Sequence, residues 1–255
     1  MRFEKWQALG NDYLIVTEPV DADAVRRACD RHTGIGADGV LLVEPAQEPG
    51  FVAGIRIFNP DGSEAELSGN GVRQAIMYLH RRGWTDAAQF SVQTVAGEIR
   101  PTILDERTCR VDMGRAQIGE EAEAGGVRGQ EVRIGNPQFA VRIEDREALE
   151  ALDLPAIGPA IEHDARFENR TNVSFWTETG PGAIRARIFE RGVGETLSSG
   201  TGAVGAAVAH VLRGGDSPVT VELDGGELTV DVGEDLHVDL TGWAEPVFSG
   251  EWPIA

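Results

Sequence analysis

Two serines stand in matching turns and could place one hydroxyl on each side of a bound carbon. Ser68 opens the run Ser-Gly-Asn-Gly and Ser199 the run Ser-Gly-Thr-Gly, each ahead of an apolar segment. Glycines after the serine expose backbone N–H groups at a helix start, and two such starts would bind one carboxylate if they converged. Each serine would then lie beside the α-carbon of a bound amino acid. The pattern predicts proton transfer at that carbon from both faces.

A simpler interpretation is that both serines only cap helices. Serine is among the best N-cap residues, because its side-chain oxygen accepts a backbone N–H from the first helical turn. Its hydroxyl is also a weak acid that normally needs an adjacent base before it can act. Three glutamates close to the turns in sequence are candidates for that base: Glu66, Glu190 and Glu195.

The two turns belong to an internal duplication. Arg56-Ile57-Phe58 returns 131 residues later as Arg187-Ile188-Phe189, and Glu64 returns as Glu195. A second echo, at a slightly different spacing, relates Gly10-Asn11 to Gly135-Asn136. The chain therefore reads as two related halves, each with a strand, a polar loop, a Ser-Gly-x-Gly turn and an apolar segment.

Strand patterns dominate the elements that must position these turns. Segments rich in β-branched residues or with alternating polarity recur between turn residues along the whole chain. Helix patterns are fewer and cover residues 21–30, 71–82, 144–152 and 203–212, the last apolar nearly all round, as in a buried helix. Strands do not alternate regularly with helices, so the pattern favours an α+β fold with strands wrapped around one apolar helix per half.

Composition excludes several classes of function. A net charge of −19 repels phosphates and argues against nucleic acid and anionic membranes as partners. No apolar run is long enough for a membrane span, and the first residues lack the apolar stretch of a signal peptide, so we expect a cytoplasmic protein. The two cysteines, Cys29 and Cys109, form no CxxC pair and are expected to be reduced structural thiols.

Cofactor and metal motifs are also missing. Lys5 is the only lysine among 23 basic residues and fits neither a Schiff-base pocket nor a P-loop. The run Gly-Ile-Gly-Ala-Asp-Gly at 34–39 matches GxGxxG, but a strand pattern follows it instead of a helix, so we interpret it as a tight turn. The five histidines are scattered without metal-ligand spacing. We therefore expect no cofactor and no metal.

The long motifs, taken in order, resemble those of the diaminopimelate epimerase family over nearly the whole chain. The family makes a precursor of lysine and peptidoglycan by cofactor-independent epimerisation of an amino acid. The matching segments are Phe3-Glu4-Lys5, Gly10-Asn11-Asp12, Gly34-Ile35-Gly36-Ala37-Asp38, Phe58-Asn59-Pro60-Asp61-Gly62-Ser63, Ser68-Gly69-Asn70-Gly71-Val72-Arg73, Gly135-Asn136-Pro137, Arg170-Thr171-Asn172, Glu190-Arg191-Gly192-Val193-Gly194-Glu195-Thr196 and Gly200-Thr201-Gly202.

The resemblance implies a fold of two pseudo-symmetric halves, each a curled mixed β-sheet around a central helix, with the site between them. We expect the halves to be residues 1–117, joined by 242–255, and residues 118–241, with the seam near 115–129. The resemblance also implies a homodimer and a small-molecule amino-acid substrate, LL-diaminopimelate, which is converted to the meso form. By matched position, the reacting carboxylate would be bound by Gly69, Asn70, Gly200 and Thr201, and the rest of the substrate by Asn11, Asn59, Asn136, Asn172, Glu190 and Arg191.

The chain departs from the family pattern at the residues that move protons. The family's two catalytic cysteines fall on Ser68 and Ser199, its active-site histidine falls on Gln138, and a glutamine that often follows Gly-Ala-Asp falls on Gly39. The expected catalytic pair is therefore Ser68 and Ser199. Two alternatives stay open: a related isomerase, racemase or dehydratase acting on another small acid, and a non-catalytic homologue that binds an amino acid.

Overall fold

The computed structural model describes residues 1–65 and 67–253, and the chain divides into two compact units. Unit 1 consists of Met1–Asp112 and Gly242–Ala255, and unit 2 of Met113–Thr241. The chain crosses from one unit to the other within strands β9 (Thr108–Arg115) and β18 (His237–Trp243). In the part of the chain that is described, no helix has the length and apolar character needed to cross a membrane.

Unit 1 is built on one mixed sheet whose strand order is β19-β1-β2-β3-β4-β6-β7, with β5 paired to β4. Strand β8 pairs with the first half of β9, with Ile103 opposite Cys109, and these two strands belong to the second sheet of the chain. The bounds are β1 (Arg2–Ala8), β2 (Asn11–Val16), β3 (Val40–Pro45), β4 (Ala53–Phe58), β5 (Glu64–Ala65), β6 (Val92–Thr94), β7 (Gly97–Ile99), β8 (Pro101–Ile103), β19 (Glu245–Glu251), α1 (Ala22–Cys29) and α2 (Gly69–Arg81).

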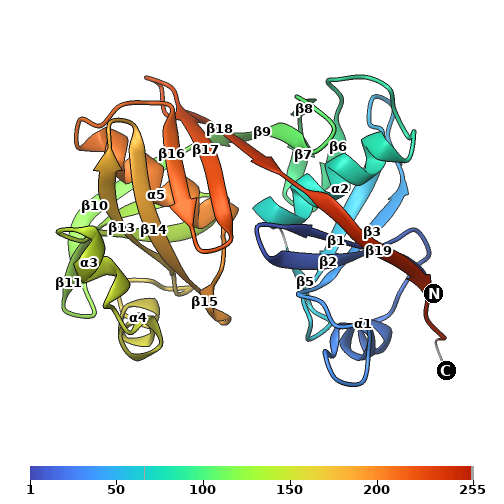
Figure 1. Ribbon diagram of the computed structural model, residues 1–255, viewed down its shortest axis with the longest axis horizontal. Helices are drawn as coiled ribbons and strands as arrows, with labels where there is room; N and C mark the ends of the chain where they lie inside the picture. The colour runs from blue at the N-terminus through green and yellow to red at the C-terminus, as the bar shows by residue number, and fades with distance from the viewer. Residues whose placement is uncertain (66, 254–255) are drawn as a thin grey trace. The chain divides into compact units, whose positions relative to one another are not determined.

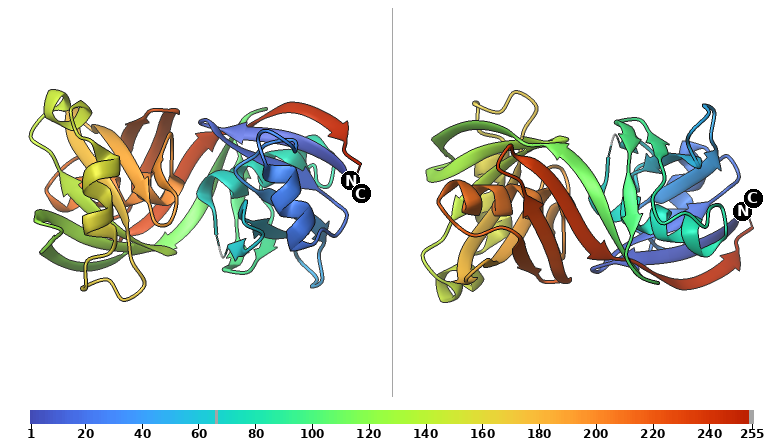
Figure 2. Two further views of the ribbon diagram at one scale, coloured as in Figure 1. Left: turned by 90° about the horizontal axis from the view of Figure 1, so that it is seen from below. Right: turned by 90° about the horizontal axis from the view of Figure 1, so that it is seen from above.

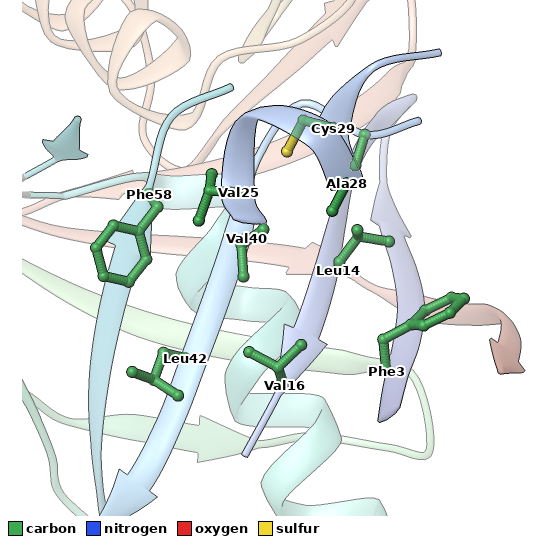
Figure 3. Packing of buried hydrophobic residues seen from close by; sticks show 10 residues of the cluster. Phe3, Leu14, Val16, Val25, Ala28, Cys29, Val40, Leu42 and Phe58 are labelled. Atoms are coloured by element: carbon green, nitrogen blue, oxygen red, sulfur yellow. The ribbon is translucent and has the colours of Figure 1, made fainter. Parts of the chain in front are cut away.

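Alternation along β2 and β3 sends neighbouring side chains to opposite faces of the unit 1 sheet. Leu14, Val40 and Leu42 pack against α1 in one hydrophobic cluster, whose side chains Figure 3 shows beneath that helix. The residues between them in sequence face α2. Leu41, for example, lies so close to this helix that a Cβ added to Gly71 would be 3.2 Å from a Leu41 methyl carbon. The sheet therefore lies between α1 and α2 (Figure 1), and Tyr13 of β2 falls on the α2 face.

The two ends of the chain meet in unit 1. Strands β1 and β19 pair antiparallel, and the amino group and carbonyl of Met1 each bond to the backbone of Trp252 at 2.9 Å. Figure 2 shows the end of β19 close to the first residues of the chain from both directions. The C-terminal segment thus completes the edge of the sheet that begins with the first residues.

Unit 2 has a larger mixed sheet with the strand order β10-β11-β12-β13-β14-β16-β17-β18, and β15 pairs with β14. The strands curl around α5, which contacts β11, β12, β13, β14, β16 and β17 (Figures 1 and 2). The bounds are β10 (Gln117–Ala124), β11 (Val127–Ile134), β12 (Asn136–Arg142), β13 (Asn172–Gly180), β14 (Ala183–Glu190), β15 (Gly194–Thr196), β16 (Val219–Leu223), β17 (Gly226–Val232), α3 (Arg146–Glu150), α4 (Leu154–Glu162) and α5 (Gly200–Leu212).

The structure confirms the α+β class and the internal duplication. Helices α2 and α5 both have 13 residues and begin directly after a serine, at the spacing of the sequence repeat. The repeated ion pairs also match, because Arg56 bonds Glu64 at 2.8 Å and Arg187 bonds Glu195 at 3.0 Å. The expectation of a nearly all-apolar buried helix at 203–212 is confirmed in α5, where every residue from Gly200 to His210 is buried.

Two segments differ from the sequence patterns. The polar stretch at 115–129, expected at the seam, forms most of a hairpin, because β10 is an edge strand that can expose glutamates on both faces. Helix α4 has no counterpart among the expected helices, since two prolines and a glycine disfavour it. Pro155 sits in its first turn, where no N–H partner is needed, and Leu154 and Ile161 anchor the helix in the core.

Candidate active site

The two serines occupy the same place in their units. Ser68 precedes α2 with extended backbone angles, and its Oγ accepts the N–H of Gly71 at 3.1 Å. Ser199 precedes α5 in the same conformation, and its Oγ accepts the N–H of Gly202 at 3.2 Å. Both serines are therefore helix caps, as the simpler interpretation expected. The cap also fixes each hydroxyl at the positive end of a buried helix.

Little space is left for a side chain where each serine meets its helix. A Cβ on Gly71 would lie 3.2 Å from Oγ of Ser68, and one on Gly202 would lie 2.8 Å from a methyl carbon of Ile188. The expected carboxylate-binding residues fall in the first turn of each helix, where backbone N–H groups have no partner within the helix. Those residues are Gly69 and Asn70 in α2, and Gly200 and Thr201 in α5.

A buried guanidinium supports the turn of α2. Arg73 is fully buried, donates to the carbonyl of Gly69 at 3.2 Å and to Oδ1 of Asn70 at 2.7 Å, and has no acidic partner among the described residues. Burial lowers the pKa of Arg73 to about 10, which still leaves it charged at neutral pH. The Arg73 guanidinium therefore lies against the first turn of α2, which holds two of the expected carboxylate-binding residues.

The other two unit 1 candidates lie at strand ends and are held by neighbours. Asn11 begins β2, donates from its amide to Asp38 at 2.8 Å, and accepts at its carbonyl from Gln74 of α2 at 2.9 Å. Asn59 follows β4, and its amide donates to Oγ of Ser63 at 3.0 Å. The Gln74 bond ties Asn11 to the same helix that Ser68 caps.

In unit 2 the expected substrate-binding residues lie at the ends of three strands. Asn136 and Asn172 begin the parallel strands β12 and β13, and Glu190 ends β14. The side-chain oxygen of Asn172 accepts the backbone N–H of Arg191 at 2.8 Å, and the Arg191 guanidinium donates to the carbonyl of Asn169 at 2.7 Å. The start of β13 therefore shapes the turn that carries Arg191.

Among the three glutamates considered as bases, Glu195 is engaged by an arginine. Oε1 of Glu195 forms an ion pair with Nη2 of Arg187 at 2.5 Å. Its counterpart in unit 1, Glu64, is bonded to Arg56. Glu190 is half-buried at the end of β14. Glu66 lies outside the described residues. A carboxylate whose oxygen is occupied by an arginine is less available to take a proton from substrate, which counts against Glu195.

Sequence reasoning missed two polar groups at the Ser68 turn. Tyr13 donates from its hydroxyl to Oγ of Ser68 at 3.2 Å, and Arg73 lies beneath Gly69 and Asn70. The sequence similarity between Gly10-Asn11 and Gly135-Asn136 could have identified Tyr13 as a site residue. Extending that similarity by two residues aligns Tyr13 with Gln138, a position already singled out.

The expected structural thiols are confirmed as free and buried. Cys29 lies in the α1 cluster, and Cys109 lies in β9. Burial raises the pKa of both thiols to about 12. Neither cysteine lies in a Ser-Gly-x-Gly turn, so the chain has no thiol at the positions where proton transfer is expected.

A hollow of about 430 Å³ lies elsewhere in unit 2, near the C-terminal end of α5. Its walls include Trp176, Ala209 and Arg213. None of the expected site residues lines it, so it is separate from the Ser199 turn.

Comparison with known proteins decides the family. A family model described as diaminopimelate epimerase matches residues 3–119 and 131–245. The chain belongs to the diaminopimelate epimerase family. Diaminopimelate epimerases of similar sequence come from Pelotomaculum thermopropionicum, 40% identical over 99% of both chains, and Desulforudis audaxviator, 41% identical over 99% of both chains. The predicted class of enzyme, an isomerase, is confirmed by this membership.

Solved structures of lower identity share the fold. A phenazine biosynthesis protein of the PhzF family from Bacillus anthracis superposes with a TM-score of 0.79 at 17% identity, covering 100% of this chain and 99% of that one. A hydroxyproline epimerase from Agrobacterium vitis, solved with trans-4-hydroxy-L-proline, gives 0.70 at 18%, covering 98% and 91%. The diaminopimelate epimerase fold is thus shared by proteins of quite different sequence.

Proposed function

We propose that this protein epimerises LL-diaminopimelate to the meso form without a cofactor, with Ser68 and Ser199 transferring protons on opposite faces of the α-carbon. The observation that carries the proposal is the matched pair of seryl caps at the starts of α2 and α5. Relatives about 40% identical over the full chain, all diaminopimelate epimerases by name, support this substrate.

In this proposal the two helix starts bind the α-carboxylate. Backbone N–H groups of Gly69, Asn70, Gly200 and Thr201 would donate to its oxygens, and the charge of Arg73 adds attraction on the α2 side. Removal of the α-proton leaves an electron pair on the α-carbon. This negative charge delocalises into the carboxylate. Donors already fixed around that group stabilise this charge as it develops.

The rest of the substrate would be held by residues at the strand ends. In this proposal Asn11, Asn59, Asn136, Asn172 and Glu190 bind its polar groups. Arg191 suits the distal carboxylate, because a guanidinium can donate two parallel hydrogen bonds to it.

Independence from pyridoxal phosphate is supported by the state of Lys5. Its ammonium donates to the carbonyl of Gly36 at 2.6 Å and pairs with Asp12 at 2.7 Å. Schiff-base lysines act as neutral amines in desolvated pockets. An ammonium held by a carboxylate is the opposite environment, and the chain has no second lysine.

The deciding experiment is incubation of the purified protein with LL-diaminopimelate in D2O. We expect meso product and deuterium at the α-carbon, because the proton delivered to the second face comes from a group that exchanges with solvent. Folded protein that gives neither result rejects the proposal. An unsaturated or oxo product indicates a related isomerase or dehydratase, and thermal stabilisation by the amino acid without turnover indicates a non-catalytic binding protein.

A matched control distinguishes the loss of a catalytic hydroxyl from a general effect of losing a serine hydroxyl on folding. Ser68→Ala and Ser199→Ala should each abolish epimerisation while lowering stability by about 1 kcal/mol through loss of the cap. Ser217→Ala removes a hydroxyl that bonds Asp231 and Val232 elsewhere in unit 2, and it should leave turnover unchanged.

The proposal includes a homodimer, which the family resemblance implies, and a location in the cytoplasm. Sedimentation of the purified protein tests the assembly, and a mass of one chain across micromolar concentrations contradicts it.

A further inference from the structure

The oxygen of Ser68 has two hydrogen-bond donors, one more than a helix cap needs. The N–H of Gly71 lies at 3.1 Å and the hydroxyl of Tyr13 at 3.2 Å. A hydroxyl oxygen has two lone pairs, and with both donors in place neither lone pair is available to a proton on carbon. Ser68 can accept the α-proton only after one of these bonds is reversed.

The position of Tyr13 is built into unit 1. Its ring is buried, and β2 directs it to the α2 face of the sheet. Room for the ring depends on Gly39, where a Cβ would lie 2.5 Å from a Tyr13 ring carbon and 2.4 Å from the carbonyl oxygen of Phe58. The Tyr13 ring borders Gly39, and its hydroxyl bonds Ser68, so one side chain meets both positions.

Unit 2 lacks this arrangement. Tyr13 is the third residue after Gly10, and the third residue after Gly135 is Gln138, which is buried on β12 against Gly205 of α5. In the described part of the chain, neither amide atom of Gln138 has a hydrogen-bond partner. Oγ of Ser199 accepts the backbone N–H of Gly202 at 3.2 Å. Tyr13 and Gln138 therefore occupy equivalent strand positions in the two units. Tyr13 bonds to the serine cap of its unit, and Gln138 does not.

We propose that Tyr13 is a positioning residue that makes Ser68 able to accept the α-proton, an inference that rests on the proposed epimerase function. The phenol first gives its proton to solvent water. The hydroxyl of Ser68 then donates to the phenolate oxygen, which leaves one lone pair of Oγ facing the substrate while Gly71 keeps the other.

The proton transfer at this face is balanced. The α C–H bond breaks and its electron pair stays on carbon, Oγ of Ser68 takes the α-proton, and the former hydroxyl proton of Ser68 forms the O–H bond of Tyr13. Ser199 protonates the opposite face and then takes a proton from water, and the hydroxide formed neutralises the proton that the phenol gave to solvent. In the reverse direction Tyr13 returns a proton to Ser68 as Ser68 protonates carbon. A phenol ordinarily ionises near pH 10, far below a seryl hydroxyl, so this relay replaces an alkoxide with a phenolate.

The test compares Tyr13→Phe with Tyr78→Phe in the full-length protein. The chain has two tyrosines, and Tyr78 lies in α2 against Trp6. We expect Tyr13→Phe to lower kcat by about 100-fold, with KM within about 2-fold, and to remove the rise of kcat with pH. Tyr78→Phe should keep the rate and the pH profile. In that variant, the ultraviolet absorbance of tyrosinate reports Tyr13 alone, and its midpoint should match the midpoint of the rate profile.

A second comparison distinguishes a relay from a structural role. A thiol ionises near pH 8.5 without a phenol, so adding Tyr13→Phe to Ser68→Cys should cost less than about 3-fold in kcat. An equal loss in both backgrounds means that Tyr13 only supports the fold and overturns this inference. An active wild type whose Tyr13→Phe variant keeps its rate and pH profile also overturns it, while the epimerase function stands. A wild type that exchanges no deuterium overturns the proposed function and this inference with it.

Discussion

The side-chain oxygen of Asn172 accepts the backbone N–H of Arg191 across 2.8 Å, joining the start of β13 to the turn after β14. The two residues are neighbours in space because β13 and β14 pair antiparallel. This bond sets the path of the chain at Arg191 and so the place from which its guanidinium reaches a substrate.

Loss of this bond should weaken substrate binding more than it slows chemistry. We expect Asn172→Ala to raise KM for diaminopimelate about 5- to 10-fold, the effect of one lost hydrogen bond plus any direct contact of the amide with substrate. Steady-state kinetics measures this. Asn169→Ala is the matched control, because Arg191 bonds the backbone carbonyl of Asn169, which remains. An unchanged KM in Asn172→Ala contradicts the prediction.

Restoring thiols at the two caps should increase turnover and create a new chemical sensitivity. The double variant Ser68→Cys with Ser199→Cys should raise kcat at least about 10-fold, since a thiolate forms far more readily than an alkoxide. Wild-type activity should resist iodoacetamide at neutral pH, because Cys29 and Cys109 are buried with pKa values of about 12. The double variant should be inactivated by the reagent. Rapid inactivation of the wild type is the opposing result.

Arg73 should matter for anion affinity. Arg73→Met keeps much of the buried volume but removes the cation and the donors to Gly69 and Asn70. We expect KM to rise about 10-fold and the affinity for simple dicarboxylates, measured by calorimetry, to fall by a similar factor. Arg82→Met removes a half-exposed arginine paired with Glu4 and should change neither quantity. If both variants bind dicarboxylates equally, Arg73 has no role at the anion site.

Gly39 should tolerate no side chain. Gly39→Ala forces a methyl group against the Phe58 carbonyl and the Tyr13 ring, so we expect a loss of about 1–3 kcal/mol in the free energy of unfolding. Gly54→Ala in β4 is the control, because its Cβ would meet no atom within 4 Å. Urea titration compares the two, and equal midpoints contradict the crowding at Gly39.

The Asp12 carboxylate should make unit 1 sensitive to acid. Its burial raises the pKa, but hydrogen bonds from Arg31 and Lys5 outweigh burial and hold the pKa below 3.8. A carboxylate with a lowered pKa adds stability at pH values above its unfolded pKa, and this stability is lost as pH falls through the folded pKa. Lys5→Met should therefore reduce stability at neutral pH and flatten its decline below about pH 4. Urea midpoints across that range measure both effects.

The sequence alone determined the duplication, the α+β class and the family. The helix starts follow from short-range signals, because a serine cap and a following apolar run favour a helix start. Helices α2 and α5 accordingly match in length and cap. The expected caps at Ser68 and Ser199 needed no information from distant parts of the chain.

Tertiary structure alone decided which side chains meet the caps. Tyr13 and Ser68 are 55 residues apart, and their contact depends on the face that β2 presents to α2 and on the space left by Gly39. The burial of Arg73 and the formation of α4 likewise depend on what packs around them. Long-range hydrogen bonds and burial arise from the pairing and register of strands, and a local pattern of residue types does not contain that information.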